Sequence, residues 1–131
     1  MIPAINGRQR ILVVDAKQMV ADRVAAFLRH NGYESKAAYS VGEALALSRF
    51  WPPDLILADV SQPGSEVVES ALGLCTAIPD CQLVLMYTDE ADVALIQHYK
   101  NTGENFEMIH TPVDPQELLL FVSRLVEDKA A

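Results

Sequence analysis

The chain has 131 residues, of which 50% are hydrophobic and 21% are charged, as expected of one globular domain. Its formal net charge of −8 argues against direct nucleic-acid binding, because the phosphate backbone attracts basic rather than acidic proteins. No apolar run approaches the length of about 18 residues that a membrane-spanning helix needs. Cys75 and Cys81 fit neither a metal site nor a disulfide framework, so we expect reduced thiols in a cytoplasmic protein without membrane contact.

The chain is predicted to begin with a disordered leader, residues 1–9, followed by one domain over residues 10–131. Within this domain, short apolar runs bounded by turn residues predict strands, and apolar residues at helical spacing predict helices. The predicted elements, in chain order, are a strand over 11–14, a helix over 17–31, a strand over 33–39, a helix over 40–50, a strand over 54–59, a helix over 66–77, a strand over 83–87, a helix over 89–101, a strand over 106–110 and a helix over 114–127.

Local signals mark the ends of several of these helices. Ser40 and Glu43 form a capping box, in which each side chain satisfies a free N–H at the start of a helix. Gly32 ends the first helix, because glycine is favoured just past a helix end. An acidic cap, Asp114, and a proline at the first helical position open the last helix. Five strands alternating with five helices imply a parallel sheet with helices on both faces.

Polar side chains stand at the ends of three buried strands. Asp15 follows the first strand, Asp59 closes the third, and Thr88 follows the fourth. Either acid on its own would be explained more simply as a turn or capping residue. Because open α/β sheets bind ligands at the carboxyl ends of their strands, the three together indicate a site.

A set of short motifs occurs in a specific order along the chain. They are ILVVD at 11–15, PDLILAD at 53–59 followed by PG at 63–64, LMYT at 85–88, and TP at 111–112 followed by DPQELL at 114–119. As a set they resemble the receiver domain of bacterial two-component response regulators, and the resemblance covers residues 10–126. It implies a flavodoxin-like three-layer α/β sandwich, whose five parallel strands have the order 2-1-3-4-5, and a signalling module rather than an enzyme.

By this resemblance Asp59 is the phosphoacceptor, which takes a phosphoryl group from a histidine kinase or a phosphotransfer protein. Mg²⁺ would be held by Asp15, Asp59 and the backbone carbonyl of Ser61, and would balance the charge of the phosphoryl group. Thr88 would donate a hydrogen bond to a phosphoryl oxygen. The signal would leave through the face formed by the fourth helix, fifth strand and fifth helix, toward a partner protein or a second copy of the chain in a homodimer.

The sequence departs from the family pattern at four positions. Ala16 stands where the family has a second acid for the metal, and Thr111 stands where it has a lysine that pairs with the phosphoryl group. Met108 occupies the position of the aromatic switch residue, with Phe106 as the alternative ring. Asp89 stands where a small residue is usual. The first two losses predict a Mg²⁺ site weakened by about tenfold or more, and a weaker phosphoryl contact.

Two interpretations of function follow from these departures. One is a receiver phosphorylated at Asp59, and the other is a degenerate receiver that acts by protein contact without phosphate. A flavodoxin-like enzyme or nucleotide-binding protein is disfavoured, because no G-x-G-x-x-G or Walker loop occurs. Asp89 is expected to cap the following helix, with replacement of the lost metal ligand as the alternative. Lys17 is expected to be a solvated residue, with a stand-in for the lost cation as the alternative.

Overall fold

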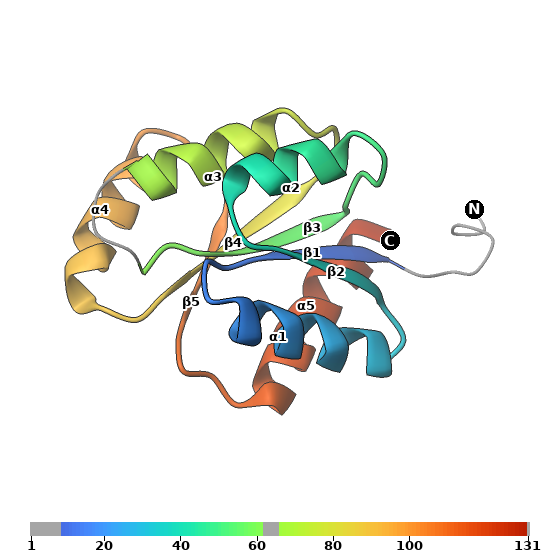
Figure 1. Cartoon of the computed structure of the whole chain (residues 1–131). Helices are drawn as coiled ribbons and strands as arrows, with labels where there is room; N and C mark the ends of the chain where they lie inside the picture. The colour runs from blue at the N-terminus through green and yellow to red at the C-terminus, as the bar shows by residue number, and fades with distance from the viewer. Residues whose placement is uncertain (1–8, 62–65, 131) are drawn as a thin grey trace.

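The computed structural model describes residues 9–61 and 66–130, without the side chains of residues 66, 90–92 and 127–130. Strands and helices alternate along this part of the chain (Figure 1), which confirms the predicted order. Their bounds are β1 Arg10–Val14, α1 Gln18–His30, β2 Glu34–Ala38, α2 Val41–Ser48, β3 Leu55–Asp59, α3 Glu66–Thr76, β4 Gln82–Tyr87, α4 Glu90–Asn101, β5 Glu107–His110 and α5 Pro115–Ala130. Residues 1–8 of the predicted leader lie outside the described residues, so that assignment stays a prediction.

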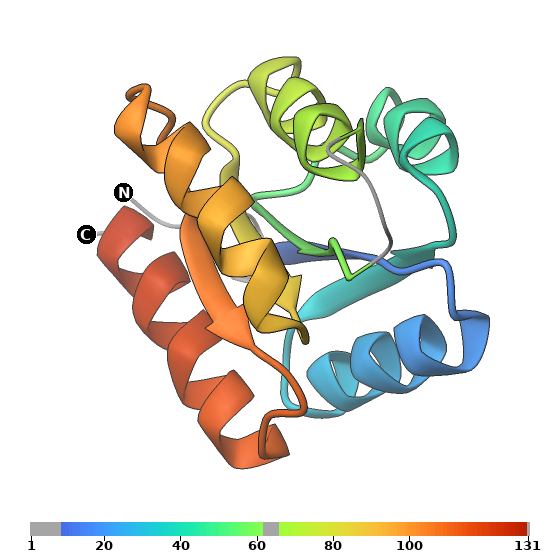
Figure 2. The ribbon, with the colours of Figure 1, turned by 90° about the vertical axis from the view of Figure 1, so that its left-hand side faces the viewer.

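The strands form one parallel sheet in the order β2-β1-β3-β4-β5, as predicted. Helices α1 and α5 cover one face of this sheet, and α2 and α3 cover the other (Figure 1). Figure 2 shows the same layers from the side of α4 and β5. The order of the strands reverses between β1 and β3, because the chain leaves β1 toward one edge and returns to build the other. Ligand sites of such sheets lie at this switch point.

Side chains that alternate across the sheet divide the core into two apolar clusters, one on each face. The central strands contribute fully buried residues to both clusters, which explains why they are continuous apolar runs rather than alternating ones. Leu12, Ile56 and Leu85 pack on the side of α2 and α3, together with Ile96 of α4. Val13, Leu57 and Val84 pack on the side of α1 and α5, together with Leu28 and Val122.

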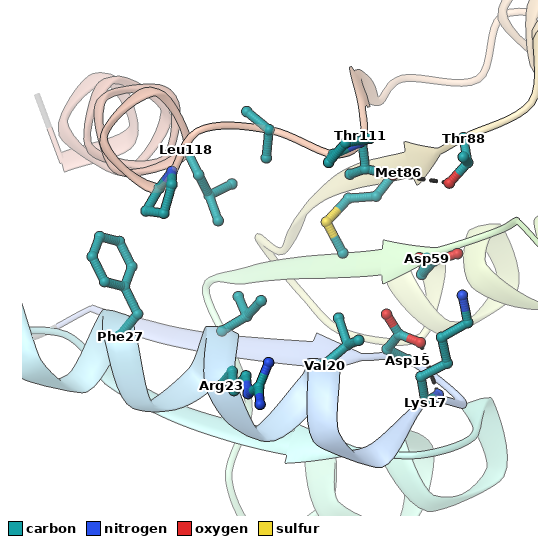
Figure 3. A pocket seen from close by; sticks show the side chains of 14 residues that line it. Asp15, Lys17, Val20, Arg23, Phe27, Asp59, Met86, Thr88, Thr111 and Leu118 are labelled. Atoms are coloured by element: carbon teal, nitrogen blue, oxygen red, sulfur yellow. Dashed lines mark hydrogen bonds between the residues drawn. The ribbon is translucent and has the colours of Figure 1, made fainter.

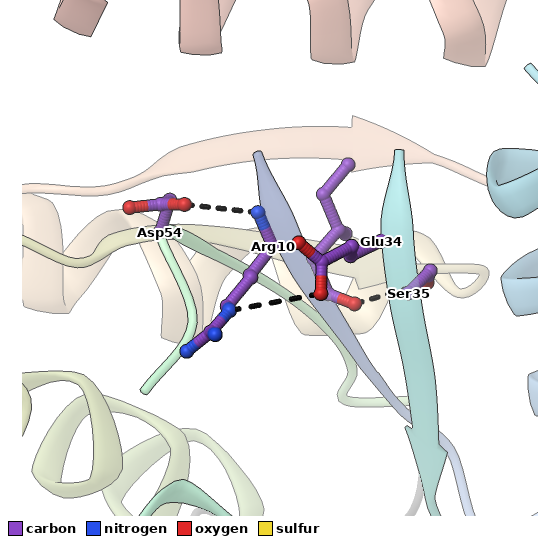
Figure 4. Close-up of polar contacts among 5 residues, drawn as sticks. Arg10, Glu34, Ser35 and Asp54 are labelled. Carbon is purple, nitrogen blue, oxygen red and sulfur yellow. Dashed lines mark hydrogen bonds and ion pairs between the residues drawn. The ribbon is translucent and has the colours of Figure 1, made fainter. Parts of the chain in front are cut away.

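Polar contacts fix the alignment of β1 at the amino end of the sheet (Figure 4). The Arg10 N–H donates to Asp54 Oδ2 at 2.9 Å, and the Arg10 side chain lies 3.9 Å from Glu34 of β2. The buried Ser35 hydroxyl donates to the Ile11 carbonyl at 2.9 Å, so it is satisfied despite its burial. These bonds tie β1 to β2 and to the residue before β3, and therefore help to set the register at the opposite end of the sheet.

The helix signals in the sequence take the expected roles, with one change in partner. Ser40 Oγ accepts the Glu43 N–H at 3.1 Å, and a Glu43 carboxylate oxygen accepts the N–H of Tyr39 at 3.2 Å. The capping box is thus present, although the acid bonds to the residue before the cap rather than to the cap itself. Within the described residues, no helix combines the length and apolar character needed to cross a membrane.

The packing of β3 predicts a large asymmetry between two leucine truncations. Leu57 is fully buried at the centre of the sheet, so Leu57→Ala is expected to lower the free energy of unfolding by about 2–5 kcal/mol. Leu120 of α5 is 70% exposed, so Leu120→Ala is expected to change it by less than about 0.5 kcal/mol. Urea unfolding of both variants measures the difference, and equal losses would contradict this core assignment.

Candidate functional site

Four strand ends meet in one cavity at the carboxyl edge of the sheet. Asp15 follows β1, Asp59 is the last residue of β3, and Thr88 and Thr111 follow β4 and β5. All four line a cavity of about 450 Å³ (Figure 3), whose other walls come from α1 and from the segment that leads into α5. The switch point therefore holds the three polar residues that the sequence indicated as a site, together with Thr111, which the resemblance placed at the lysine position.

The register of β1 against β3 places two carboxyl groups side by side. Val14 pairs with Ala58, so Asp15 and Asp59 follow at neighbouring positions. Asp15 is only 4% exposed, and its Oδ1 accepts the N–H of Lys17 at 2.9 Å. Its Oδ2 is buried and has no hydrogen-bond partner among the described residues. Burial raises the pKa of Asp15 above its usual 3.8, and the nearby Asp59 carboxyl adds to this, whereas the Lys17 N–H opposes the rise.

Asp59 is half-buried and is oriented by the loop that follows it. Its Oδ1 accepts the N–H of Ser61 at 2.7 Å, across the turn that leaves β3. This bond fixes one carboxylate oxygen and keeps the side chain at the mouth of the cavity. A carboxylate held in this way, and not fully removed from water, has the geometry of a nucleophile toward a group that enters the cavity.

A chain of three hydroxyl groups runs along the mouth of the cavity. Ser61 Oγ lies 3.0 Å from Thr88 Oγ1, which lies 3.1 Å from Thr111 Oγ1. Thr111 in turn donates to the carbonyl of Tyr87 at 3.2 Å. A hydroxyl has one proton, so the direction of the whole chain follows from its last bond. Thr111 gives its proton to the carbonyl, Thr88 donates to Thr111, and Ser61 donates to Thr88.

The β1–α1 turn carries the residues that distinguish this site. Ala16 is exposed and has no side-chain oxygen to offer, in agreement with the missing ligand inferred from the sequence. Lys17 is exposed, as expected, yet it also lines the cavity. In Figure 3 its side chain extends toward the carboxyl groups of Asp15 and Asp59. Sequence reasoning favoured a solvated lysine and left the stand-in role as the alternative, and the cavity geometry is compatible with both.

The oxygen atoms at this edge of the sheet fit a Mg²⁺ ion, although few of them belong to charged side chains. Mg²⁺ takes oxygen ligands and keeps several waters, and the partnerless Oδ2 of Asp15 is an oxygen that a cation would satisfy. Within the described part of the chain, no group of three acidic, histidine or cysteine side chains is placed to hold a metal. Among the described residues, Asp15 and Asp59 are the acids that line the cavity. Ser61 as a carbonyl ligand stays a prediction.

The remaining sequence-based assignments lie at the border of the site. Asp89 is exposed and directly precedes α4, so a capping role and a metal role both stay predictions. Met108 lies on β5 and packs partly against the core on the α2 and α3 side. Phe106, the alternative switch ring, precedes β5 and is 3% exposed, with the Lys100 ammonium 5.2 Å from its centre. A switch role for either residue stays a prediction.

Sequence reasoning missed two parts of the site. It considered Ser61 for its carbonyl, but it did not anticipate the hydroxyl contact with Thr88. It also did not anticipate the apolar wall, to which Val20 and Phe27 of α1 and Leu118 of α5 contribute. For the first, a polar residue two positions after Asp59 is a weak signal. The second has no local signal, because the two helices are far apart in the sequence.

Comparison with known proteins agrees with this geometry. The family model of the response regulator receiver domain matches residues 11–123. The DNA-binding response regulator MtrA of Mycolicibacterium smegmatis is 31% identical over 114 residues, which cover 86% of this chain and 48% of MtrA. Protein PilH of Pseudomonas aeruginosa is 24% identical over 122 residues, which cover 89% of this chain and 97% of PilH. The chain therefore spans about half the length of MtrA and nearly all of PilH.

Solved structures share the fold at low sequence identity. A CheY-like response regulator receiver domain protein from Methanospirillum hungatei superposes with a TM-score of 0.77 at 24% identity, covering 94% of this chain and 97% of that one. A response regulator from Thermotoga maritima gives a TM-score of 0.77 at 21% identity, covering 92% and 98%. The backbone likeness extends over nearly the whole of each chain, so the fold is that of CheY-like receivers.

The burial of Asp15 predicts a gain in stability on neutralising it. The raised pKa means that the folded state keeps a proton which the unfolded state releases, so the Asp15 contribution to stability is full below pH 3.8 and declines as the pH rises above it. Asp15→Asn removes this decline and is expected to stabilise the metal-free protein at neutral pH by about 1 kcal/mol. Urea unfolding with a chelator, repeated down to acidic pH, should show the gain shrink toward pH 3.8.

Asp114→Asn is the matched control for this measurement. Asp114 Oδ1 accepts the N–H of Gln116 at 2.7 Å, two residues on, as Asp15 accepts that of Lys17. Asp114 is exposed, however, so neutralising it relieves no burial of charge. A gain of the same size in both variants, or a gain at Asp15 that is independent of pH, would contradict the role of burial.

The hydroxyl chain predicts a cost for removing the Thr111 oxygen. Thr111→Val keeps the shape of the side chain but removes the acceptor for Thr88 and the donor to the Tyr87 carbonyl. We expect a loss of about 1 kcal/mol in the free energy of unfolding. Thr111→Ser keeps the hydroxyl and is expected to retain most of that stability. Urea unfolding compares the two, and a valine variant as stable as the serine variant would refute the bonded chain.

Proposed function

The chain belongs to the response regulator receiver domain family, and on that premise we propose that it relays a signal by accepting a phosphoryl group on Asp59. The juxtaposition of Asp59 with Asp15 and Thr88 at the switch point is the observation that carries this proposal. Receiver domains are signalling modules rather than enzymes. The donor is a phosphohistidine of a kinase or phosphotransfer protein, as is usual for the family.

The transfer step needs little from the protein beyond position and charge. A carboxylate oxygen of Asp59 attacks the phosphorus, the bond between phosphorus and the donor imidazole nitrogen breaks, and that nitrogen keeps the electron pair. The Ser61 N–H holds the other acceptor oxygen at 2.7 Å and so orients the attacking one. Thr88 would donate to a phosphoryl oxygen, and for this its proton must first leave Thr111.

A Mg²⁺ ion at the acidic pair completes the proposal. Asp15, Asp59 and the carbonyl of Ser61 would hold it, with water at the other positions. When bound, it supplies positive charge that offsets the repulsion between a carboxylate and a phosphoryl group. Ala16 contributes no carboxylate, so affinity is expected to be about tenfold lower than at a site with the full acidic set.

The output surface is proposed to be the face of α4, β5 and α5. Lys100 of α4 lies 3.8 Å from Glu107 of β5, and its ammonium lies 5.2 Å from the ring of Phe106. These contacts couple α4 to β5, so a shift of one element would move the other. A partner protein or a second copy of the chain is the proposed reader of this face. MtrA is named a DNA-binding regulator, and half of its length lies outside the match.

Amide NMR tests the acceptor directly. Adding Mg²⁺ with beryllofluoride or acetyl phosphate is expected to shift the amide signals around Asp59, Ser61 and Thr88, and Asp59→Asn is expected to abolish the shifts. Asp54→Asn is the matched control, because it makes the same change just before β3 at the far end of that strand. Wild-type protein that gives no shift at millimolar Mg²⁺ would refute phosphorylation and leave the phosphate-independent module.

A further inference from the structure

We propose that Lys17 binds the phosphoryl group on Asp59 through its ammonium and so supplies the positive charge that Thr111 lacks. This inference rests on the proposed function, since it assigns a further contact within the same site. It differs from the family pattern in the origin of the charge. The cation comes from the β1–α1 turn on one side of the acceptor, instead of from the end of β5 on the other.

The backbone fixes Lys17 beside the acidic pair. Its N–H donates to Asp15 Oδ1 at 2.9 Å, and its extended backbone, with φ −83° and ψ 99°, precedes the first turn of α1. The side chain makes no capping bond to the helix, because an ammonium has no acceptor atom for the free N–H groups there. Lys17 lines the same cavity as Asp59 and Thr88, and Figure 3 shows it extending toward Asp59.

Thr111 cannot replace a lysine, because it carries no charge and its one hydroxyl proton is already donated in a hydrogen bond. It donates to the Tyr87 carbonyl and accepts from Thr88, so it has lone pairs but no free hydrogen for a phosphoryl oxygen. Thr88 also donates within this chain. At rest, the hydroxyl side of the mouth therefore offers a phosphoryl group neither charge nor a proton that is free of a partner.

The charges of the cavity point to Lys17 as the compensating group. Asp15 and Asp59 are both acids, and the buried Oδ2 of Asp15 has no hydrogen-bond partner among the described residues. The described basic residues of the cavity wall are Lys17 and Arg23. Arg23 is six residues further along the chain, which is about 9 Å along the axis of α1, and Figure 3 draws it away from Asp59.

The resting structure leaves the ammonium available for a ligand. No ion pair joins Lys17 to a described acid, although two carboxyl groups lie in the same cavity. A phosphoryl group on Asp59 adds negative charge at the point toward which the side chain extends. A charge-assisted hydrogen bond is then gained in the phosphorylated state alone. In the resting state the charge of Lys17 acts on Asp15 at longer range, so Lys17 would favour the phosphorylated state over the resting one.

Beryllofluoride binding tests this contact. At saturating Mg²⁺, Lys17→Gln is expected to weaken beryllofluoride binding about tenfold or more, as followed by the amide shifts of Asp59 and Ser61. Arg23→Gln removes the same charge from the same cavity wall and is expected to change the beryllofluoride affinity by less than about twofold. Lys17→Arg keeps the charge and is expected to restore most of the affinity.

Magnesium binding gives a second readout, with the opposite sign. An ammonium beside the acidic pair repels a metal ion, so Lys17→Gln is expected to bind Mg²⁺ severalfold more tightly than wild-type protein. A variant that had merely damaged the site would lose affinity for both ligands. Far-ultraviolet circular dichroism verifies that each variant is folded.

The outcomes separate this inference from the function on which it rests. Equal beryllofluoride affinities for Lys17→Gln and Arg23→Gln, with a clear wild-type response, would overturn the role of Lys17 and leave Asp59 as the acceptor. Weaker Mg²⁺ binding by Lys17→Gln would also overturn it. Absence of any response in wild-type protein would overturn both proposals together.

Discussion

The register between β1 and β3 is the constraint on which the site depends. Because Val14 pairs with Ala58, the acids that follow these two residues arrive at the same edge of the sheet as neighbours. Fully buried apolar residues on both faces hold the pairing, and the bond between Arg10 and Asp54 anchors its far end. A slip of one residue would exchange the side chains that pack on the two faces and would move Asp15 and Asp59 out of alignment, so the packing of the core and the site are specified together.

The proposed site combines the carboxylate of Asp59 with neutral residues at two positions where the family has charged ones. Ala16 removes a carboxylate from the metal side, and Thr111 removes a cation from the phosphoryl side. In the place of that cation, a chain of hydroxyls ends on a backbone carbonyl and is satisfied without any ligand. A ligand must therefore compete with bonds that already exist. A cation that enters from Lys17 avoids this competition, because its ammonium has no ion-pair partner among the described acids.

Particular residues show how far the sequence leads and where it stops. Asp15, Asp59 and Thr88 could be identified as one site, because parallel strands separated by helices must end at the same edge. The capping box at Ser40 was also identifiable, although its acid bonds to Tyr39 rather than to the cap. The contact between Ser61 and Thr88 could not be predicted, since it joins two loops that have no periodic pattern.

The sequence by itself determined the five alternating units and the parallel sheet, because apolar periodicity and turn residues act over a few neighbouring positions, and its resemblance to receiver domains indicated Asp59 as the acceptor. Only the tertiary structure decided how the polar groups around Asp59 are arranged. It fixed the direction of the hydroxyl chain, left one oxygen of Asp15 without a partner, and extended Lys17 along the cavity wall. These features depend on distances between loops that are remote in sequence, and such distances are set by the packing of α1 and α5 on the sheet.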